Sequence, residues 1–307
     1  MSIQSLCFSA ANPQHVPRNP QSGCSNLSPK LISMVPPPST FSVAGSCLPD
    51  LSAQVKEKIL CLEIMGINSS KALTINPSLE VTTLDSINTV VSYLQSKGLH
   101  YKDLGRILGM CPTILTSDVR RDLAPVFRFL REELGVRESN YRRIIKKCPR
   151  LLISSVPDQL KPTLTYLRRI GFDNDETLAC QDPILLVSSV ENTLMPKLDH
   201  LQSEIGLSRD ESLEMVLRCP ALFTFSIENN LKPKLGFFVD VMNGDLKEIR
   251  EFPQYFGFSL EKRIKPRYSI LVENHVTSIV PLSFMLKTTD LEFRQLIIDK
   301  TARRRRS

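Results

Sequence analysis

The fold is decided by a stretch from Cys148 to Gly171 that reads CPRLLISSVPDQLKPTLTYLRRIG. Pro149 has no N–H to donate and its ring clashes with the preceding turn, so it ends the helix before it. Thirteen residues later, Pro162 lies near the start of a segment whose apolar residues are spaced three and four apart, as on one face of a helix. Gly171 follows as a C′ residue suited to the left-handed conformation. The stretch therefore predicts a helix end, a short apolar turn and a new helix.

This pattern recurs along the chain. A proline followed by apolar residues stands at Pro77, Pro112, Pro149, Pro183, Pro220 and Pro253, in steps of 35, 37, 34, 37 and 33 residues. A second proline follows 13 residues later in five units, at Pro125, Pro162, Pro196, Pro233 and Pro266, whereas Val90 stands there in the first unit. Helical units of this length bury their apolar faces only by stacking on their neighbours. We predict an all-α fold, a curved α-solenoid or superhelix of about six repeats, with its concave surface as the natural binding site.

Within each unit, the sequence predicts two helices and the places where they begin and end. A long helix ends at a glycine, which is Gly98, Gly135, Gly171 or Gly206 in four of the units. A shorter helix then begins, and the pairs Asp173 with Glu176 and Ser208 with Glu211 have the spacing of a capping box. The next proline ends this second helix.

The repeated Leu-x-Pro-x-x-x-x-Leu, the glycine, and then Cys-Pro-x-Leu-Leu or Cys-Pro-x-Ile-Leu resemble the repeat of the mitochondrial transcription termination factor (mTERF) family, in its plant organellar form. The resemblance runs from about Leu51 to about Ile298. It implies repeats of two helices plus a 3₁₀-like turn, and binding of organellar DNA or RNA in transcription, transcript maturation, splicing or ribosome assembly. The pentatricopeptide family has a similar period, but its units lack the paired prolines.

The first 49 residues have the composition of a targeting segment. They contain no Asp or Glu, ten Ser and eight Pro, which is typical of an organellar transit peptide. A single Arg and many hydroxyls favour the chloroplast over the mitochondrion, the alternative compartment; a disordered tail of a cytosolic protein is the plainer alternative. We predict a disordered transit peptide over residues 1–49, the solenoid over 50–298 and a basic tail over 299–307.

The net charge of +7 is concentrated at the ends of the chain. Arg18, Lys30 and the four arginines 303–306 account for six charges, which leaves about +1 for residues 50–302. Any nucleic-acid surface must therefore come from basic residues gathered on one face. We predict three groups of phosphate-binding residues, although ordinary solvated lysines at helix ends are the competing interpretation of the first. They are a row beside the second prolines (Lys161, Lys197, Lys232, Lys234, Lys265 and Arg267), a cluster of five within nine residues (Arg142, Arg143, Lys146, Lys147 and Arg150) and the tail (Arg303, Arg304, Arg305 and Arg306).

Other classes of site have little support in the sequence. The eight cysteines form no C-x-x-C pair, no run of 18 apolar residues occurs, and no phosphate-binding glycine loop or nucleophile motif is present. Cys111, Cys148 and Cys219, each directly before a proline, are interpreted as small buried packing residues. We expect no catalytic residue, metal, cofactor, membrane span or small-molecule substrate.

These observations predict a nucleic-acid-binding regulator of organellar gene expression, foremost a chloroplast transcription termination factor. Its partners would be organellar double-stranded DNA or RNA and organellar transcription or RNA-processing proteins. An α-solenoid scaffold for protein–protein interactions remains the alternative, because the body of the chain is nearly neutral.

Overall fold

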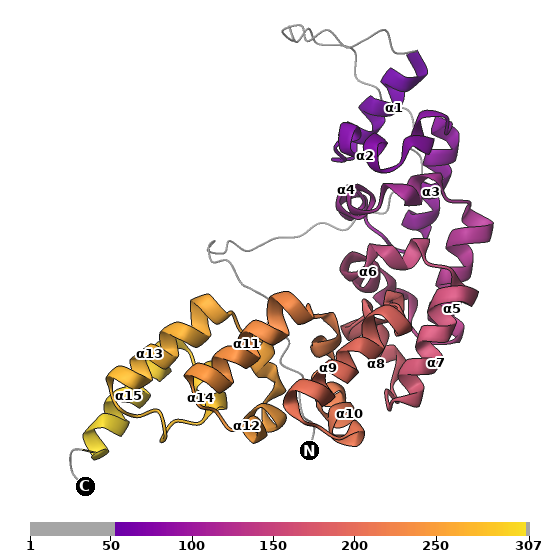
Figure 1. Ribbon diagram of the computed structural model, residues 1–307. Coiled ribbons are helices and arrows are strands. Elements are labelled where there is room, and N and C mark those ends of the chain that lie inside the picture. Colours follow the sequence, from indigo (N-terminus) through magenta and orange to yellow (C-terminus); the bar gives the residue numbers. More distant parts are fainter. Residues whose placement is uncertain (1–52, 305–307) are drawn as a thin grey trace, which may run out of the picture. The chain divides into compact units, whose positions relative to one another are not determined.

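A computed structural model describes residues 53–304, which all belong to one unit, Asp50–Ser307. Every regular element in this range is helical, and the repeats follow one another in chain order (Figure 1). The predicted all-α solenoid is confirmed. The predicted targeting segment 1–49 lies outside the described residues.

Six complete repeats share one order of elements: a first helix, a second helix and a short 3₁₀ closing turn. The first helices are α1 (Ala53–Ile64), α3 (Leu84–Ser96), α5 (Ala124–Glu132), α7 (Lys161–Arg169), α9 (Met195–Ile205) and α11 (Lys232–Gly236), the last extended by η10 (Phe237–Val241). The second helices are α2 (Ser69–Ile75), α4 (Tyr101–Met110), α6 (Glu138–Lys147), α8 (Asp175–Gln181), α10 (Arg209–Arg218) and α12 (Leu246–Glu251). The closing turns are η1 (Pro77–Glu80), η2 (Pro112–Thr116), η4 (Pro149–Ile153), η6 (Leu185–Val187), η8 (Pro220–Thr224) and η11 (Pro253–Gly257).

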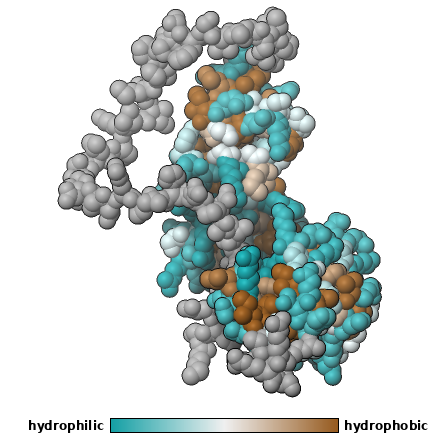
Figure 2. Space-filling model, turned by 90° about the vertical axis from the view of Figure 1, so that its left-hand side faces the viewer, coloured by the Kyte–Doolittle hydropathy of each residue, from teal (hydrophilic) through white to brown (hydrophobic). Residues whose placement is uncertain are grey.

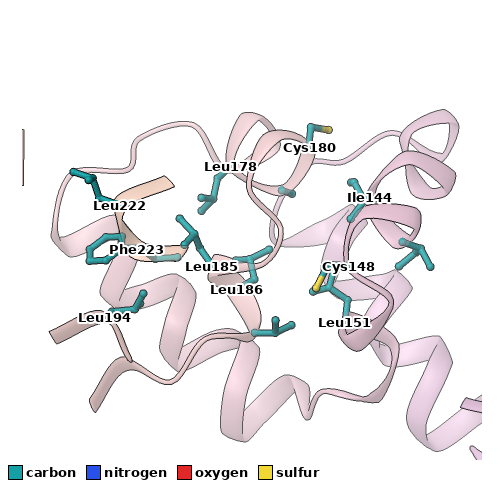
Figure 3. Packing of buried hydrophobic residues seen from close by; sticks show 14 of the residues in the cluster. Ile144, Cys148, Leu151, Leu178, Cys180, Leu185, Leu186, Leu194, Leu222 and Phe223 are labelled. Carbon is teal, nitrogen blue, oxygen red and sulfur yellow. The ribbon is translucent and has the colours of Figure 1, made fainter. Parts of the chain in front are cut away.

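The closing turns carry the core. Each closing turn buries apolar residues that follow its proline: Leu79 alone in η1, and a neighbouring pair in the others, such as Leu151 with Leu152 and Leu222 with Phe223, at exposures of 0–1%. Figure 3 shows Leu151, Leu185, Leu222 and Phe223 of the closing turns among side chains of the second helices, such as Ile144 and Leu178. The turns of successive repeats belong to one hydrophobic cluster. The proline pattern thus marks the places where neighbouring repeats are held together.

One local feature was not predicted: a five-residue π turn leads into each first helix that carries a second proline. These turns are η3 (Val119–Leu123), η5 (Val156–Leu160), η7 (Val190–Leu194), η9 (Ile227–Leu231) and η12 (Leu260–Ile264). In η5, the N–H of Lys161 donates to the carbonyl of Val156, five residues back. A proline at Pro162 would clash with the carbonyl four residues earlier in a regular helix, and the wider turn avoids that clash.

A side-chain oxygen caps each π turn, always seven residues before the second proline. The capping residues are Asp118, Ser155, Ser189, Ser226 and Ser259. Each accepts a hydrogen bond from a backbone N–H two or three residues on, which satisfies a donor that the helix start leaves unpaired. The first helices therefore begin about seven residues earlier than the prolines alone indicate.

The glycines between the two helices behave as predicted. Gly98, Gly135, Gly171 and Gly206 have positive φ, from 66° to 106°. The sixth repeat has Asn243 at this place, with φ of 47°, and Asn tolerates the left-handed region better than most residues.

The prediction for the start of α8 was wrong by one residue. Asn174, not Asp173, is the N-cap and accepts from the N–H of Thr177 at 2.7 Å. The predicted capping box of Ser208 and Glu211 at the start of α10 is confirmed.

The chain ends in an incomplete seventh repeat. Its first helix is α13 (Lys265–Glu273), and irregular residues 274–281 lead directly to α14 (Leu282–Lys287), with no second helix between. The last helix, α15 (Asp290–Arg304), continues beyond the boundary expected at residue 298 and takes in Arg303 and Arg304. Arg305 and Arg306 lie outside the described residues. None of the described helices combines the length and the apolar character that crossing a membrane requires.

Candidate nucleic-acid interface

The structure divides the predicted row beside the second prolines into two sets. Residues directly before a proline lie at the surface, and each pairs with a glutamate. Lys161 contacts Glu133 of the preceding repeat at 2.8 Å. The other two pairs lie one turn apart in sequence, Lys232 with Glu228 at 2.7 Å and Lys265 with Glu261 at 2.5 Å. These three lysines can reach a solvent-borne phosphate, but only in competition with a carboxylate.

Residues directly after a proline turn inward. The Nζ atom of Lys197 donates to the carbonyl of Phe223, and that of Lys234 to the carbonyl of Phe256 at 2.5 Å. Lys234 is only 7% exposed, and burial lowers its pKa to about 8. The last carbonyls of a short helical turn lack hydrogen-bond donors within the turn. The ammonium groups of Lys197 and Lys234 act as those donors.

Arg267 has the same role in the seventh repeat. It is 4% exposed, donates to the carbonyl of Met285 at 2.6 Å and pairs with Asp290 at 2.5 Å. Its guanidinium also lies 4.7 Å from the centre of the Phe293 ring. Lys197, Lys234 and Arg267 therefore do not form the continuous surface row that the sequence predicted. Lys197 and Lys234 lie on the face of the first helix that packs on the closing turn of the same repeat, and Arg267 lies on the face of α13 that packs on α14.

Comparing equivalent positions of the repeats could have predicted that residues directly after the second proline are buried. Val126 and Thr163 stand at the same position, directly after the second proline, and are 0% and 2% exposed. Thr163 also donates to a closing-turn carbonyl, that of Ser188, at 3.3 Å. A position that accepts valine in one repeat is an inward position in the others. We call the contact from this position to the closing turn or to the residue that caps it, made by Thr163, Lys197 and Lys234, the closing hydrogen bond. Arg267 makes the equivalent contact to α14.

The cluster on α6 is also divided between packing and surface. Arg142 and Lys146 both bind the carboxylate of Asp103 on α4, at 2.6 and 2.9 Å. Hydrogen bonds from Arg142, which contributes most, and from Lys146 lower the pKa of Asp103 to about 2. Lys147 reaches forward to α8 and donates to the carbonyls of Cys180 and Gln181 at 3.2 and 3.1 Å. These three cations join α4, α6 and α8.

Two arginines of this cluster remain exposed. Arg143 on α6 and Arg150 in the closing turn η4 have no acidic partner among residues 53–304. A third arginine, Arg106 on α4, was not among the predicted residues; it is exposed and lies 37 residues before Arg143. That distance is one repeat, so Arg106 and Arg143 occupy equivalent positions on adjacent second helices. The repeat register could have identified Arg106. We call Arg106, Arg143 and Arg150 the second-helix arginines.

Hydrophilic residues form most of the face seen in Figure 2, and hydrophobic residues reach that surface in separate patches. No group of three or more His, Cys, Asp or Glu residues within the described part of the chain could hold a metal ion. Cys111, Cys148, Cys180 and Cys219 are buried, and burial raises the pKa of the Cys148 thiol. The packing interpretation of the cysteines before prolines agrees with this burial.

The comparison with known families accounts for the repeats. The model of the mTERF family matches residues 50–205 and again residues 178–294. The two matches overlap over residues 178–205, from the second half of α8 to the end of α9, as expected for a sequence that resembles itself at each period. mTERF proteins are organellar, nucleic-acid-binding helical-repeat proteins and not, in general, enzymes. Since the matched residues make up well over half of the 307, the chain belongs to the mTERF family.

Proposed function

We propose that this protein regulates gene expression in the chloroplast by binding nucleic acid, and that it acts as a transcription termination factor. Membership of the mTERF family supports the binding of organellar nucleic acid. The composition of residues 1–49, without Asp or Glu and rich in Ser and Pro, supports the chloroplast as the compartment.

The choice of the phosphate-binding surface depends on whether an exposed cation is paired with a carboxylate. The second-helix arginines have no acidic partner among the described residues, whereas Lys161, Lys232 and Lys265 each share their charge with a glutamate. A guanidinium without a carboxylate partner binds phosphate without first breaking an ion pair, and it can do so with two parallel hydrogen bonds. The second-helix arginines are therefore the primary phosphate contacts, and the three paired lysines are secondary ones. Arg303 to Arg306 add affinity that does not depend on sequence.

The salt dependence of binding tests this assignment. Each cation that neutralises a phosphate contributes about 0.7 to 0.9 to the slope of log affinity against log salt. Replacing Arg106, Arg143 and Arg150 with Gln should flatten this slope by roughly 2 to 3. The affinity of the full chain for chloroplast DNA and RNA fragments would be measured between low and moderate salt, with circular dichroism to check folding. An unchanged slope in a folded triple variant would reject these arginines as phosphate contacts.

Two further experiments address the compartment and the outcome. A fusion of residues 1–60 to a fluorescent protein should accumulate in chloroplasts; accumulation only in mitochondria would move the function there. Mapping of transcript 3′ ends in plants that lack the protein should show read-through beyond the sites that the tagged protein occupies. Normal 3′ ends with retained introns or unprocessed ribosomal RNA would favour a role in transcript maturation instead.

A further inference from the structure

The row of second helices stops abruptly after the sixth repeat. The next proline comes 14 positions after the left-handed residue Gly206, at Pro220, and 10 positions after Asn243, at Pro253. In the seventh repeat, Pro281 comes only 6 positions after His275. This is too short for a turn and a helix, and residues 276–281 are irregular. In Figure 1, α4, α6, α8, α10 and α12 follow one another, and no further second helix comes after α12.

A cleft lies beside α12 where the next second helix would be expected. Its volume is about 690 Å³, within the range of ligand-binding sites. Its apolar lining includes Phe252, Leu271 and Met285, and the irregular segment contributes Ile279, which is 41% exposed. Two carboxylates, those of Glu248 and Glu251, also line it. The cleft is therefore apolar in its floor and acidic on its α12 side.

The repeat register shows what is unusual about these two acids. In α6 and α10, the position two residues before the closing proline is basic and reaches the next second helix: Lys147 donates to the carbonyl of Gln181 at 3.1 Å, and Arg218 to that of Arg250 at 2.6 Å. Glu251 stands at this position in α12. The position five residues before the proline is Ile144 in α6 and Met215 in α10, both fully buried, and it is the exposed Glu248 in α12. The end of the row thus presents acceptors where α6 and α10 present a donor and an apolar side chain.

The same molecule shows how a second helix binds to a carboxylate on its neighbour. α6 packs beside α4 by placing two cations one turn apart, Arg142 and Lys146, on Asp103. Its buried seam consists of Tyr141, Ile144 and Ile145. A helix of this type has the apolar seam and the charge that the cleft beside α12 would accept.

We propose that this cleft binds a short amphipathic helix of a partner protein, with an apolar seam and two basic residues one turn apart that pair with Glu248 and Glu251. The partner helix extends the second-helix row by one member, in the manner of helix-in-groove recognition. A nucleic acid is disfavoured at this place because the two carboxylates, which repel phosphate, outnumber Lys287, the one cation in the lining. The second-helix arginines lie on α4, α6 and η4, and the cleft lies in repeats six and seven, so one chain carries separate surfaces for nucleic acid and for protein.

A peptide of residues 136–150 of this chain, which contains the α6 sequence, serves as the probe. Binding of the fluorescently labelled peptide to the full chain would be followed by anisotropy, and hydrogen exchange would show whether residues 276–283 become protected. The double variant Glu248→Gln/Glu251→Gln should weaken peptide binding roughly five- to tenfold, since each exposed ion pair contributes modestly. Glu57→Gln/Glu80→Gln, at the other end of the described chain, removes the same charge and should leave binding unchanged.

Two more variants make the result specific. Ile279→Trp places bulk in the cleft from an exposed loop position and should abolish protection of residues 276–283 by the peptide. A peptide with Arg142→Gln and Lys146→Gln should bind as weakly to the unmodified chain as the original peptide binds to Glu248→Gln/Glu251→Gln. The proposal is overturned if the peptide fails to bind, if binding ignores both glutamates, or if a single-stranded RNA protects residues 276–283 in place of the peptide.

Discussion

The side-chain ammonium of Lys234 lies 2.5 Å from the carbonyl oxygen of Phe256, and both residues belong to the sixth repeat. The closing hydrogen bond is thus made by a cation that is almost removed from water. Its ring neighbour Phe225, 5.7 Å from the ammonium, offers only a weak additional attraction.

Stability should therefore depend on pH through Lys234. Burial lowers its pKa in the folded state to about 8 from an ordinary value of 10.5. Between these values only the unfolded chain binds the proton, so folding becomes more favourable as the pH rises. The stability difference between the wild type and Lys234→Met should shift in favour of the wild type by about 2 kcal/mol from pH 7 to pH 9.5. Urea unfolding at both pH values measures it.

The control for this experiment is Lys232→Met. Lys232 is exposed, and its ion pair with Glu228 raises its pKa. Both its folded and unfolded pKa values lie above pH 9.5, so its contribution should be constant over the interval. Equal pH responses of the two variants would contradict the assignment to Lys234.

The Asp103 carboxylate should stabilise the contact between α4 and α6. Asp103→Asn removes the charge that Arg142 and Lys146 share, and it should cost about 1–2 kcal/mol at pH 7. Because the folded pKa is about 2, below the ordinary 3.8, this stabilisation is present above pH 4 and is lost as the pH falls toward 2. Thermal unfolding of both proteins at pH 7 and pH 3 would show the difference shrinking; a pH-independent difference would exclude the ion pair as its source.

The start of α8 offers a test of the cap position. Asn174→Ala removes the acceptor for the N–H of Thr177 and should cost about 1 kcal/mol. Asp173→Ala, one residue earlier, should have a much smaller effect. Unfolding in urea distinguishes the two, and a larger loss at Asp173 would restore the cap that the sequence suggested.

Two glycines on α4 should respond in opposite ways to alanine. A Cβ at Gly105 would meet the carbonyl oxygen of Met65 at 2.1 Å, whereas one at Gly109 would have nothing within 4 Å. Gly109→Ala should stabilise the protein by about 0.5–1 kcal/mol, because glycine disfavours a helix. Gly105→Ala should destabilise it by more than about 1 kcal/mol, the usual cost of overpacking. Equal effects in calorimetry would show that α4 does not pack closely on the turn after α1.

The paired lysines should matter less to nucleic-acid binding than the second-helix arginines. Lys161→Gln/Lys232→Gln/Lys265→Gln also releases three glutamates from their ion pairs. We expect this triple variant to flatten the salt slope by less than Arg106→Gln/Arg143→Gln/Arg150→Gln, measured on the same DNA and RNA fragments. The opposite order would make the first-helix lysines the main contacts.

The architecture could be predicted because its signals are local and covalent. Pro149 lacks an N–H wherever it stands, and Gly171 reaches positive φ without steric cost, so helix ends and turns follow from the sequence alone. The short distance from His275 to Pro281 could also have predicted that the seventh repeat lacks a second helix.

The candidate interface was harder to predict because the sequence shows that a residue is charged but not whether its side chain points to the solvent or into the core. Lys232 and Lys234 differ by two residues, yet one is at the surface and the other donates to a core carbonyl. That choice depends on which face of α11 meets the closing turn, which is a tertiary relationship. For the same reason Arg142 and Arg143 have different roles, one in an ion pair and one exposed.

The closing hydrogen bond also bears on how such a chain lengthens or shortens in evolution. Lys197 and the carbonyl of Phe223 lie in one repeat, as do Lys234 and the carbonyl of Phe256. Duplication or loss of a whole period therefore copies or removes donor and acceptor together. A breakpoint between a first helix and its closing turn would instead place the buried ammonium against the turn of another repeat. Recombination at the repeat boundaries is therefore expected to preserve folding.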